Sequence, residues 1–140
     1  RRAAYQFASF SHQLVEHRQF ALALALAEKS ERMLPGDEFI VPSFSFVSTA
    51  NAFALRGARP VFADIREDTL NLDESRLESL ITPRTKLILP VHYAGVGCEM
   101  DAILEIAGRN EIPVVEDNAH GLFGAYRDRL LGTFAPLATL

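Results

Sequence analysis

Apolar runs alternate with helix-period segments along the chain from Phe39 onward. The runs are short and bounded by turn-forming residues, which is typical of buried strands. They predict strands in EFIVP (38–42), PVFADI (60–65), KLILPV (86–91) and IPVVED (112–117). Strands that alternate with helices favour a parallel sheet flanked by helices, so the pattern predicts the α/β class.

Helices are predicted before and between these strands. Their segments are 19–34, 45–57, 73–81 and 99–110. Ser45 is a possible N-cap of the second helix and Gly57 its stop, since these residue types favour those positions. In the third helix, Asp73 is expected to accept from the first-turn amides, and Pro83 blocks continuation.

Composition restricts the classes of protein to which the chain can belong. Its 140 residues are 49% hydrophobic and 23% charged, which suits one domain with a sizeable core. A net charge of −4 with scattered basic residues argues against nucleic acid as a partner. No apolar run reaches the roughly 20 residues of a membrane span. The single cysteine, Cys98, cannot form an intramolecular disulfide, and the cytoplasm is the expected compartment.

Ligands of open α/β sheets bind beyond the carboxyl ends of the strands. That rule points to the segments 42–49, 64–68, 92–98 and 116–121. None of them contains a Gly-x-Gly-x-x-Gly or Walker-type loop, the two commonest nucleotide-binding signatures. Glu116, Asp117 and His120 lack a second spaced pair of ligands, so no metal site is expected.

Asp117 lies in the stretch IPVVEDNAHG (112–121), where a buried strand runs into two carboxylates. An aspartate that faces a pocket there can pair with a protonated ring nitrogen, such as that of pyridoxal phosphate. It can also be a helix N-cap or a loop carboxylate. The residues alone leave these two interpretations about evenly balanced.

Four stretches together resemble the DegT/DnrJ/EryC1/StrS family of sugar-nucleotide aminotransferases. They are PGDEFIVPSFSFVSTANAFALRGARPVFADI, LITPRTKLILPVHYAG, IPVVEDNAHG and YRDRLLGTFAPLAT. The resemblance implies part of the large domain of the aspartate aminotransferase fold (fold type I), with pyridoxal 5'-phosphate (PLP) as cofactor. It covers residues 34–140, which are expected to be a partial PLP-binding large domain. Residues 1–33 are expected to be a diverged, mostly helical segment.

The resemblance also implies a reaction and partners. The phrases FVSTANAF and PVHYAGVGCEMD look most like members that form dTDP-4-amino-4,6-dideoxygalactose. These enzymes transfer an amino group from glutamate to a 4-keto-6-deoxy sugar nucleotide, a dTDP-sugar, in the biosynthesis of cell-surface polysaccharides. Family members are usually homodimers, so a second copy of the full-length protein is an expected partner.

Three residues are carried over by position as cofactor-binding. Asp117 matches the aspartate that pairs with the pyridine nitrogen, and His120 lies where a Gln or His approaches the cofactor's 3-hydroxyl. Phe46 matches the aromatic residue that stacks on the ring. His120 could instead be a loop histidine bonded to the backbone, and Phe46 a core residue. His92 and Tyr93 are expected to be pocket walls or packing residues rather than catalysts.

The chain departs from the family in lacking the Schiff-base lysine, which holds the cofactor and moves a proton. Of its two lysines, Lys29 lies in the first predicted helix and Lys86 at the start of a strand, opposite the site. No catalytic residue is therefore assigned, and the chain is expected to be a fragment truncated just before that lysine. Two further interpretations stay open. One is an inactive remnant or small binding module, and the other is a relative, such as a dehydratase, that needs no lysine.

Overall fold

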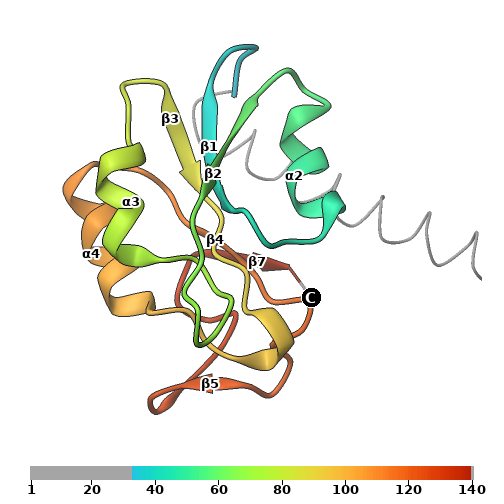
Figure 1. Cartoon of the computed structure of the whole chain (residues 1–140), viewed down its shortest axis with the longest axis vertical. Helices are drawn as coiled ribbons and strands as arrows, with labels where there is room; N and C mark the ends of the chain where they lie inside the picture. Colours follow the sequence, from blue (N-terminus) through green and yellow to red (C-terminus); the bar gives the residue numbers. More distant parts are fainter. Residues whose placement is uncertain (1–32, 140) are drawn as a thin grey trace, which may run out of the picture.

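The computed structural model describes residues 33–139 (Figure 1). The helix predicted over 19–34, and the segment before it, therefore lie outside the described residues almost entirely. The elements in chain order are β1 (Glu38–Pro42), α2 (Val47–Ala54), β2 (Arg59–Ala63), α3 (Glu74–Leu80), β3 (Thr85–Ile88), the 3-10 turn η1 (Tyr93–Gly95), α4 (Met100–Arg109), β4 (Val115–Asp117), β5 (Ala125–Tyr126), β6 (Arg129–Leu130) and β7 (Leu137–Thr139).

Five parallel strands lie side by side. β1 pairs in parallel with β2 and β3, and β4 pairs in parallel with β7. Single parallel bridges, Ile88 to Val114 and Val91 to Asp117, connect β3 to β4. The order is thus β2-β1-β3-β4-β7, which confirms the predicted α/β class and all four predicted strands. β1 has the predicted bounds, whereas the other three strands differ from the prediction at one or both ends. The antiparallel hairpin β5-β6 was not predicted from the sequence.

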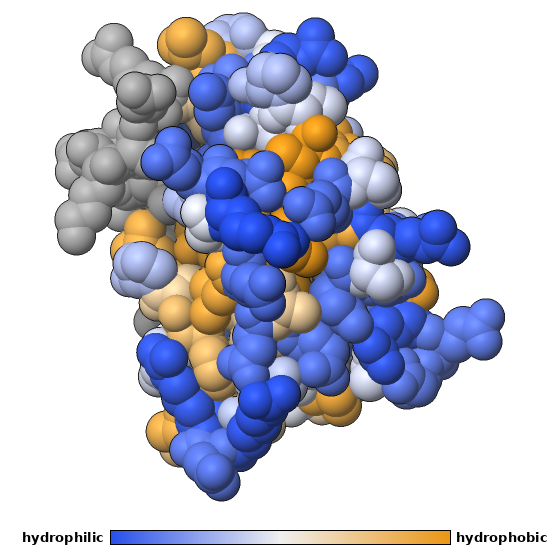
Figure 2. Space-filling view, turned by 90° about the vertical axis from the view of Figure 1, so that its left-hand side faces the viewer, coloured by the Kyte–Doolittle hydropathy of each residue, from blue (hydrophilic) through white to orange (hydrophobic). Residues whose placement is uncertain are grey.

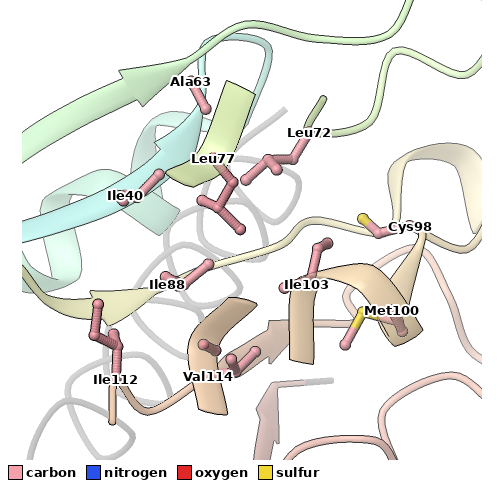
Figure 3. Close-up of a cluster of buried hydrophobic side chains, with 11 residues drawn as sticks. Ile40, Ala63, Leu72, Leu77, Ile88, Cys98, Met100, Ile103, Ile112 and Val114 are labelled. Atoms are coloured by element: carbon pink, nitrogen blue, oxygen red, sulfur yellow. The ribbon is translucent and has the colours of Figure 1, made fainter. Parts of the chain in front are cut away.

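Helices cover both faces of this sheet. In Figure 1, α3 and α4 lie on one side and α2 on the other. Between the sheet and α3/α4 lies a buried cluster (Figure 3) that includes Ile40, Leu77, Ile88, Met100 and Ile103. Beneath α2, Phe39, Val41, Phe53, Leu87 and Val115 form the second cluster. Neighbouring strand residues belong to opposite clusters because side chains alternate along a strand. The outer side of α3 and α4 is largely hydrophilic (Figure 2).

Helix ends follow the sequence in one case and not in another. The Asp73 side chain accepts from the Ser75 amide at 3.0 Å and caps α3, as predicted. The prediction for Ser45 is wrong, because α2 begins at Val47 and its cap residue is Phe46, which forms no side-chain cap. The Ser45 hydroxyl donates to the Phe46 carbonyl instead. Gly57 was predicted to stop this helix, but α2 already ends at Ala54, and Gly57, at φ 89°, lies at the end of the turn that follows it.

At the amino-terminal ends of the strands, a buried carboxylate joins three segments. Glu38, at the start of β1, is fully buried and accepts hydrogen bonds from Thr82, Arg59 and Arg84. The hydrogen bonds from Thr82 and Arg59 are the main causes that lower the pKa of Glu38 to about 2. The beginnings of β1 and β2 and the loop before β3 are therefore held together by one charge.

Candidate active site

A pocket of about 370 Å³ lies at the carboxyl ends of β1, β3 and β4. Its walls come from the segments 44–49 and 117–120, together with Val91 and Tyr93. The three residues predicted to bind a cofactor, Phe46, Asp117 and His120, all line it. The structure therefore brings together side chains that are up to 74 positions apart, from 46 to 120.

Asp117 is the acidic group of this pocket. Its side chain ends β4, and the residue is 5% exposed. One carboxylate oxygen accepts from the Thr49 hydroxyl at 2.6 Å. The other accepts from the Thr139 hydroxyl at 3.1 Å and from the Ala119 amide at 3.2 Å. Within residues 33–139 all of these donors are neutral, so the contacts hold the carboxylate in place without neutralising its charge.

Phe46 and His120 form more exposed walls of the pocket. Phe46 is 65% exposed, so the alternative that it is a core residue is wrong. His120 has the backbone contact expected of a loop histidine, because its Nδ1 accepts from the Ala94 amide at 3.4 Å. Its ring also lies edge-on to Tyr93, with 5.5 Å between centroids, and Tyr93 in turn contacts Phe44. An aromatic wall therefore lines the pocket on the side of η1.

Glu116 lies beside Asp117 in β4 but has a different set of contacts. It is fully buried and accepts from the backbone amides of Gly132, Phe134 and Ala135 and from His92 Nε2. Burial opposes ionisation of this carboxyl, but the hydrogen bonds from His92 and the amides outweigh it and lower its pKa. No role was predicted for Glu116 from the sequence, in which the period-two alternation along the strand was the one available signal.

His92 and Tyr93 behave as the sequence predicts, one as a packing residue and the other as a pocket wall. His92 is fully buried, and its Nδ1 accepts from the Cys98 amide at 3.2 Å. Nε2 must therefore carry the proton that is donated to Glu116 at 3.0 Å. The Cys98 thiol is 1% exposed and donates to the Val91 carbonyl. Burial raises its pKa to about 12, so it is not a nucleophile at neutral pH.

Lys86 is far from this site along the strand direction. It lies in β3 and lines a separate pocket of about 610 Å³ with Pro83, Ile112 and Pro113, near the beginnings of the strands. The prediction that Lys86 is at the end opposite the site is confirmed, whereas Lys29 lies outside the described residues. In the described part of the chain, no lysine lines the pocket that contains Asp117.

No group of three or more His, Cys, Asp or Glu side chains in residues 33–139 could hold a metal ion. Over that range, no helix has the length and apolar character needed to cross a bilayer.

Comparison with known proteins finds a matching family for the chain. The sequence model of the DegT/DnrJ/EryC1/StrS aminotransferase family matches residues 19–140. The chain is 49% identical over 111 residues to the spore coat polysaccharide biosynthesis protein SpsC of Bacillus subtilis (strain 168), covering 79% of this chain and 28% of SpsC. It is 46% identical over 117 residues to GDP-perosamine synthase of Caulobacter vibrioides (strain ATCC 19089 / CIP 103742 / CB 15), covering 84% of this chain and 32% of the synthase.

Solved structures share the fold. The aminotransferase from Psychrobacter cryohalolentis superposes with a TM-score of 0.79 at 30% identity, over 89% of this chain and 30% of that one. NtdA from Bacillus subtilis, solved with bound cofactor PMP (pyridoxamine phosphate), superposes with a TM-score of 0.77 at 37% identity, over 88% and 27%. PLP is the cofactor of this family of transaminases. The chain spans between about a quarter and a third of the length of such relatives.

Proposed function

Because the chain belongs to the DegT/DnrJ/EryC1/StrS aminotransferase family, we propose that the protein of which it is part transfers an amino group from glutamate to a 4-keto-6-deoxy sugar carried on dTDP. The product would be dTDP-4-amino-4,6-dideoxygalactose, for cell-surface polysaccharide. The name of one relative, a spore coat polysaccharide biosynthesis protein, supports the polysaccharide part of this proposal. We also infer a cytoplasmic homodimer of the full-length protein.

The observation that carries the proposal is the buried charge of Asp117. Its carboxylate lines the pocket and, among the described residues, accepts only from neutral hydroxyl and amide groups. A protonated pyridine nitrogen would supply the missing positive charge and one more N–H donor. An ion pair of this type is strengthened where water is excluded. The donor set of this pocket therefore fits the pyridine ring of PLP.

We also propose which residues of the pocket would contact the other parts of the PLP ring. When bound, PLP supplies an electron sink for the carbon that exchanges the amino group. Asp117 would keep the ring nitrogen protonated, and the exposed ring of Phe46 would offer a flat apolar face for stacking. The Nδ1 of His120 already accepts from Ala94, so Nε2 would carry a proton to donate to the 3-hydroxyl oxygen.

The lysine that the reaction needs has to come from elsewhere. Among the described residues no lysine lines the pocket, and we propose that it belongs to a part of the protein beyond Leu140. The same observation favours a second candidate function, a module that binds a cofactor without transferring an amino group. The two differ in turnover, whereas binding through Asp117 is common to both.

Binding can be tested with pyridoxamine 5'-phosphate (PMP), which needs no lysine. Titration of the purified gene product, followed by fluorescence, should give saturable binding. Asp117→Asn should weaken it roughly 10- to 100-fold, since a hydrogen bond to a charged group contributes about 1.5–3 kcal/mol. Asp64→Asn is the matched control, because this aspartate follows β2 directly, is exposed and does not line the pocket. Equal affinities of both variants and the wild type would contradict the proposed site.

Turnover separates the two candidate functions. The same gene product should be incubated with PLP, glutamate and dTDP-4-keto-6-deoxyglucose, and the nucleotide products analysed by mass spectrometry. An amino sugar product supports the transferase. Tight PMP binding without any product supports the binding module.

A further inference from the structure

Glu116 is a buried carboxylate that the proposed reaction does not use. Its four hydrogen-bond donors are the amides of Gly132 (2.8 Å), Phe134 (2.7 Å) and Ala135 (2.7 Å) and the imidazole of His92 (3.0 Å). Three of the four therefore belong to one short backbone segment, 132–135. A carboxylate with this many donors fixes the path of that segment, because a displaced segment would leave the buried charge of Glu116 without its donors.

The segment 132–135 leads directly into β7. β7 (Leu137–Thr139) pairs in parallel with β4, so that Thr139 lies opposite Asp117 (Figure 1). From there the Thr139 hydroxyl donates to the Asp117 carboxylate at 3.1 Å, and the Thr139 carbonyl accepts from the Asn118 amide at 3.2 Å. Glu116 and Asp117 thus hold the two ends of one chain segment from adjacent positions of one strand.

The pairing between β4 and β7 needs such a support because it is short. The two strands share three residue pairs, and a slip of one residue would turn the Thr139 side chain to the other face. At the start of the segment, Gly132 has φ 79°, and a Cβ on it would come within 2.6 Å of the Asn118 side chain. The segment therefore starts packed against Asn118, and from there the amide contacts of Glu116 hold the residues that lead into β7.

We propose that Glu116 is a positioning residue of the pocket, which acts by holding segment 132–135 so that Thr139 meets and orients Asp117. This inference rests on the proposed role of Asp117 in binding the cofactor ring. His92 supports it from the other side, since its ring donates to Glu116 while its amide donates to the Asp117 carbonyl at 3.0 Å. In this arrangement, Asp117 faces the pocket, and Glu116 binds the segment that brings Thr139 to Asp117.

The first test compares two single variants and their combination in PMP binding. Thr139→Val removes the donor to Asp117, and Glu116→Gln disturbs the anchor of segment 132–135. Each should weaken binding roughly three- to tenfold, as expected for the loss of one oriented contact. The double variant should be no weaker than the weaker-binding single variant, because both changes act through the same contact. Glu67→Gln makes the same chemical change at an exposed carboxylate outside the segment and the pocket, and it should bind as the wild type does.

A purely structural role of Glu116 gives a different pattern. Glu116→Gln would then lower the melting temperature and leave the PMP affinity of the folded protein unchanged, which would overturn the proposal. Additive effects in the double variant would overturn it too. If Glu116→Gln does not fold, Thr139→Val alone still decides, because wild-type affinity in this variant would contradict the proposed route.

Amide hydrogen exchange tests the inference without any cofactor. In Glu116→Gln, exchange at Asn118 and in residues 132–139 should increase at least about tenfold, while β1 keeps its protection. Unchanged exchange in 132–139 would refute the positioning role. Failure of the wild type to bind PMP, combined with increased exchange in the variant, would refute the proposed function and leave the role of Glu116 as the anchor of this segment supported.

Discussion

Replacing Thr49 by valine removes one hydroxyl from the pocket and keeps the shape of the side chain. Thr49 is 3% exposed, and its hydroxyl donates to Asp117 at 2.6 Å. After the substitution, the Asp117 oxygen that faced the hydroxyl keeps its charge but loses its donor within the described residues. Burial prevents water from replacing that donor freely, so the folded state is expected to lose stability.

The size of the effect follows from the type of hydrogen bond. A hydrogen bond to a charged group contributes about 1.5–3 kcal/mol, and we expect a decrease of that size in the free energy of unfolding for Thr49→Val. Thr49→Ser keeps the hydroxyl and loses one methyl group, which costs about 0.8 kcal/mol. Serine should therefore be the better substitute, whereas in an apolar environment valine would be.

Urea denaturation of the two variants and the wild type measures this order. With a slope of about 1–3 kcal/mol per molar urea, the midpoint of Thr49→Val should fall by roughly 1 M. Glu67→Gln serves as the control, because its side chain is exposed and the substitution should change stability by less than about 0.5 kcal/mol. A Thr49→Val protein that is as stable as Thr49→Ser, or more stable, would refute the argument.

Three further predictions concern the two ends of the sheet and the core between them. The pKa of Glu38 is lowered to about 2, so the stability that its charge contributes is complete above the ordinary pKa of 4.5 and is lost as pH falls toward 2. The difference in unfolding free energy between the wild type and Glu38→Gln should therefore be clear at pH 7 and smaller at pH 3. The exposed Glu67→Gln should differ little from the wild type at either pH. Ile103→Ala in the fully buried part of α4 should cost about 2–5 kcal/mol and Ile103→Val about 0.5–1.5 kcal/mol, and equal losses in denaturation midpoints would argue against tight packing there. Cys98, with a pKa raised by burial to about 12, should react with iodoacetamide at pH 8 only after unfolding in urea, and rapid labelling of the native protein would contradict its burial.

Local sequence signals were sufficient for the class of fold and for most of its elements. Four apolar runs became strands because their length and composition need no information from distant residues. Asp73 capped its helix because the donor lies two residues away in the same turn. Ser45 failed as a cap because the chain enters α2 one residue later than the pattern indicated, and the identity of a cap depends on that entry angle.

What the sequence determined by itself was therefore the succession of strands and helices and the set of strand ends at which a ligand could bind, since both follow from periodicity and chain direction. Only the tertiary structure decided which polar groups meet there. Thr49 donates to Asp117 across 68 positions of sequence, and Glu116 accepts from amides 16 to 19 residues further on. Period-two alternation puts the side chains of Glu116 and Asp117 on opposite faces of β4. The hydrogen-bond partners of each carboxylate, however, depend on which segments pack around that strand. That packing is a property of the whole sheet, and no local pattern encodes it.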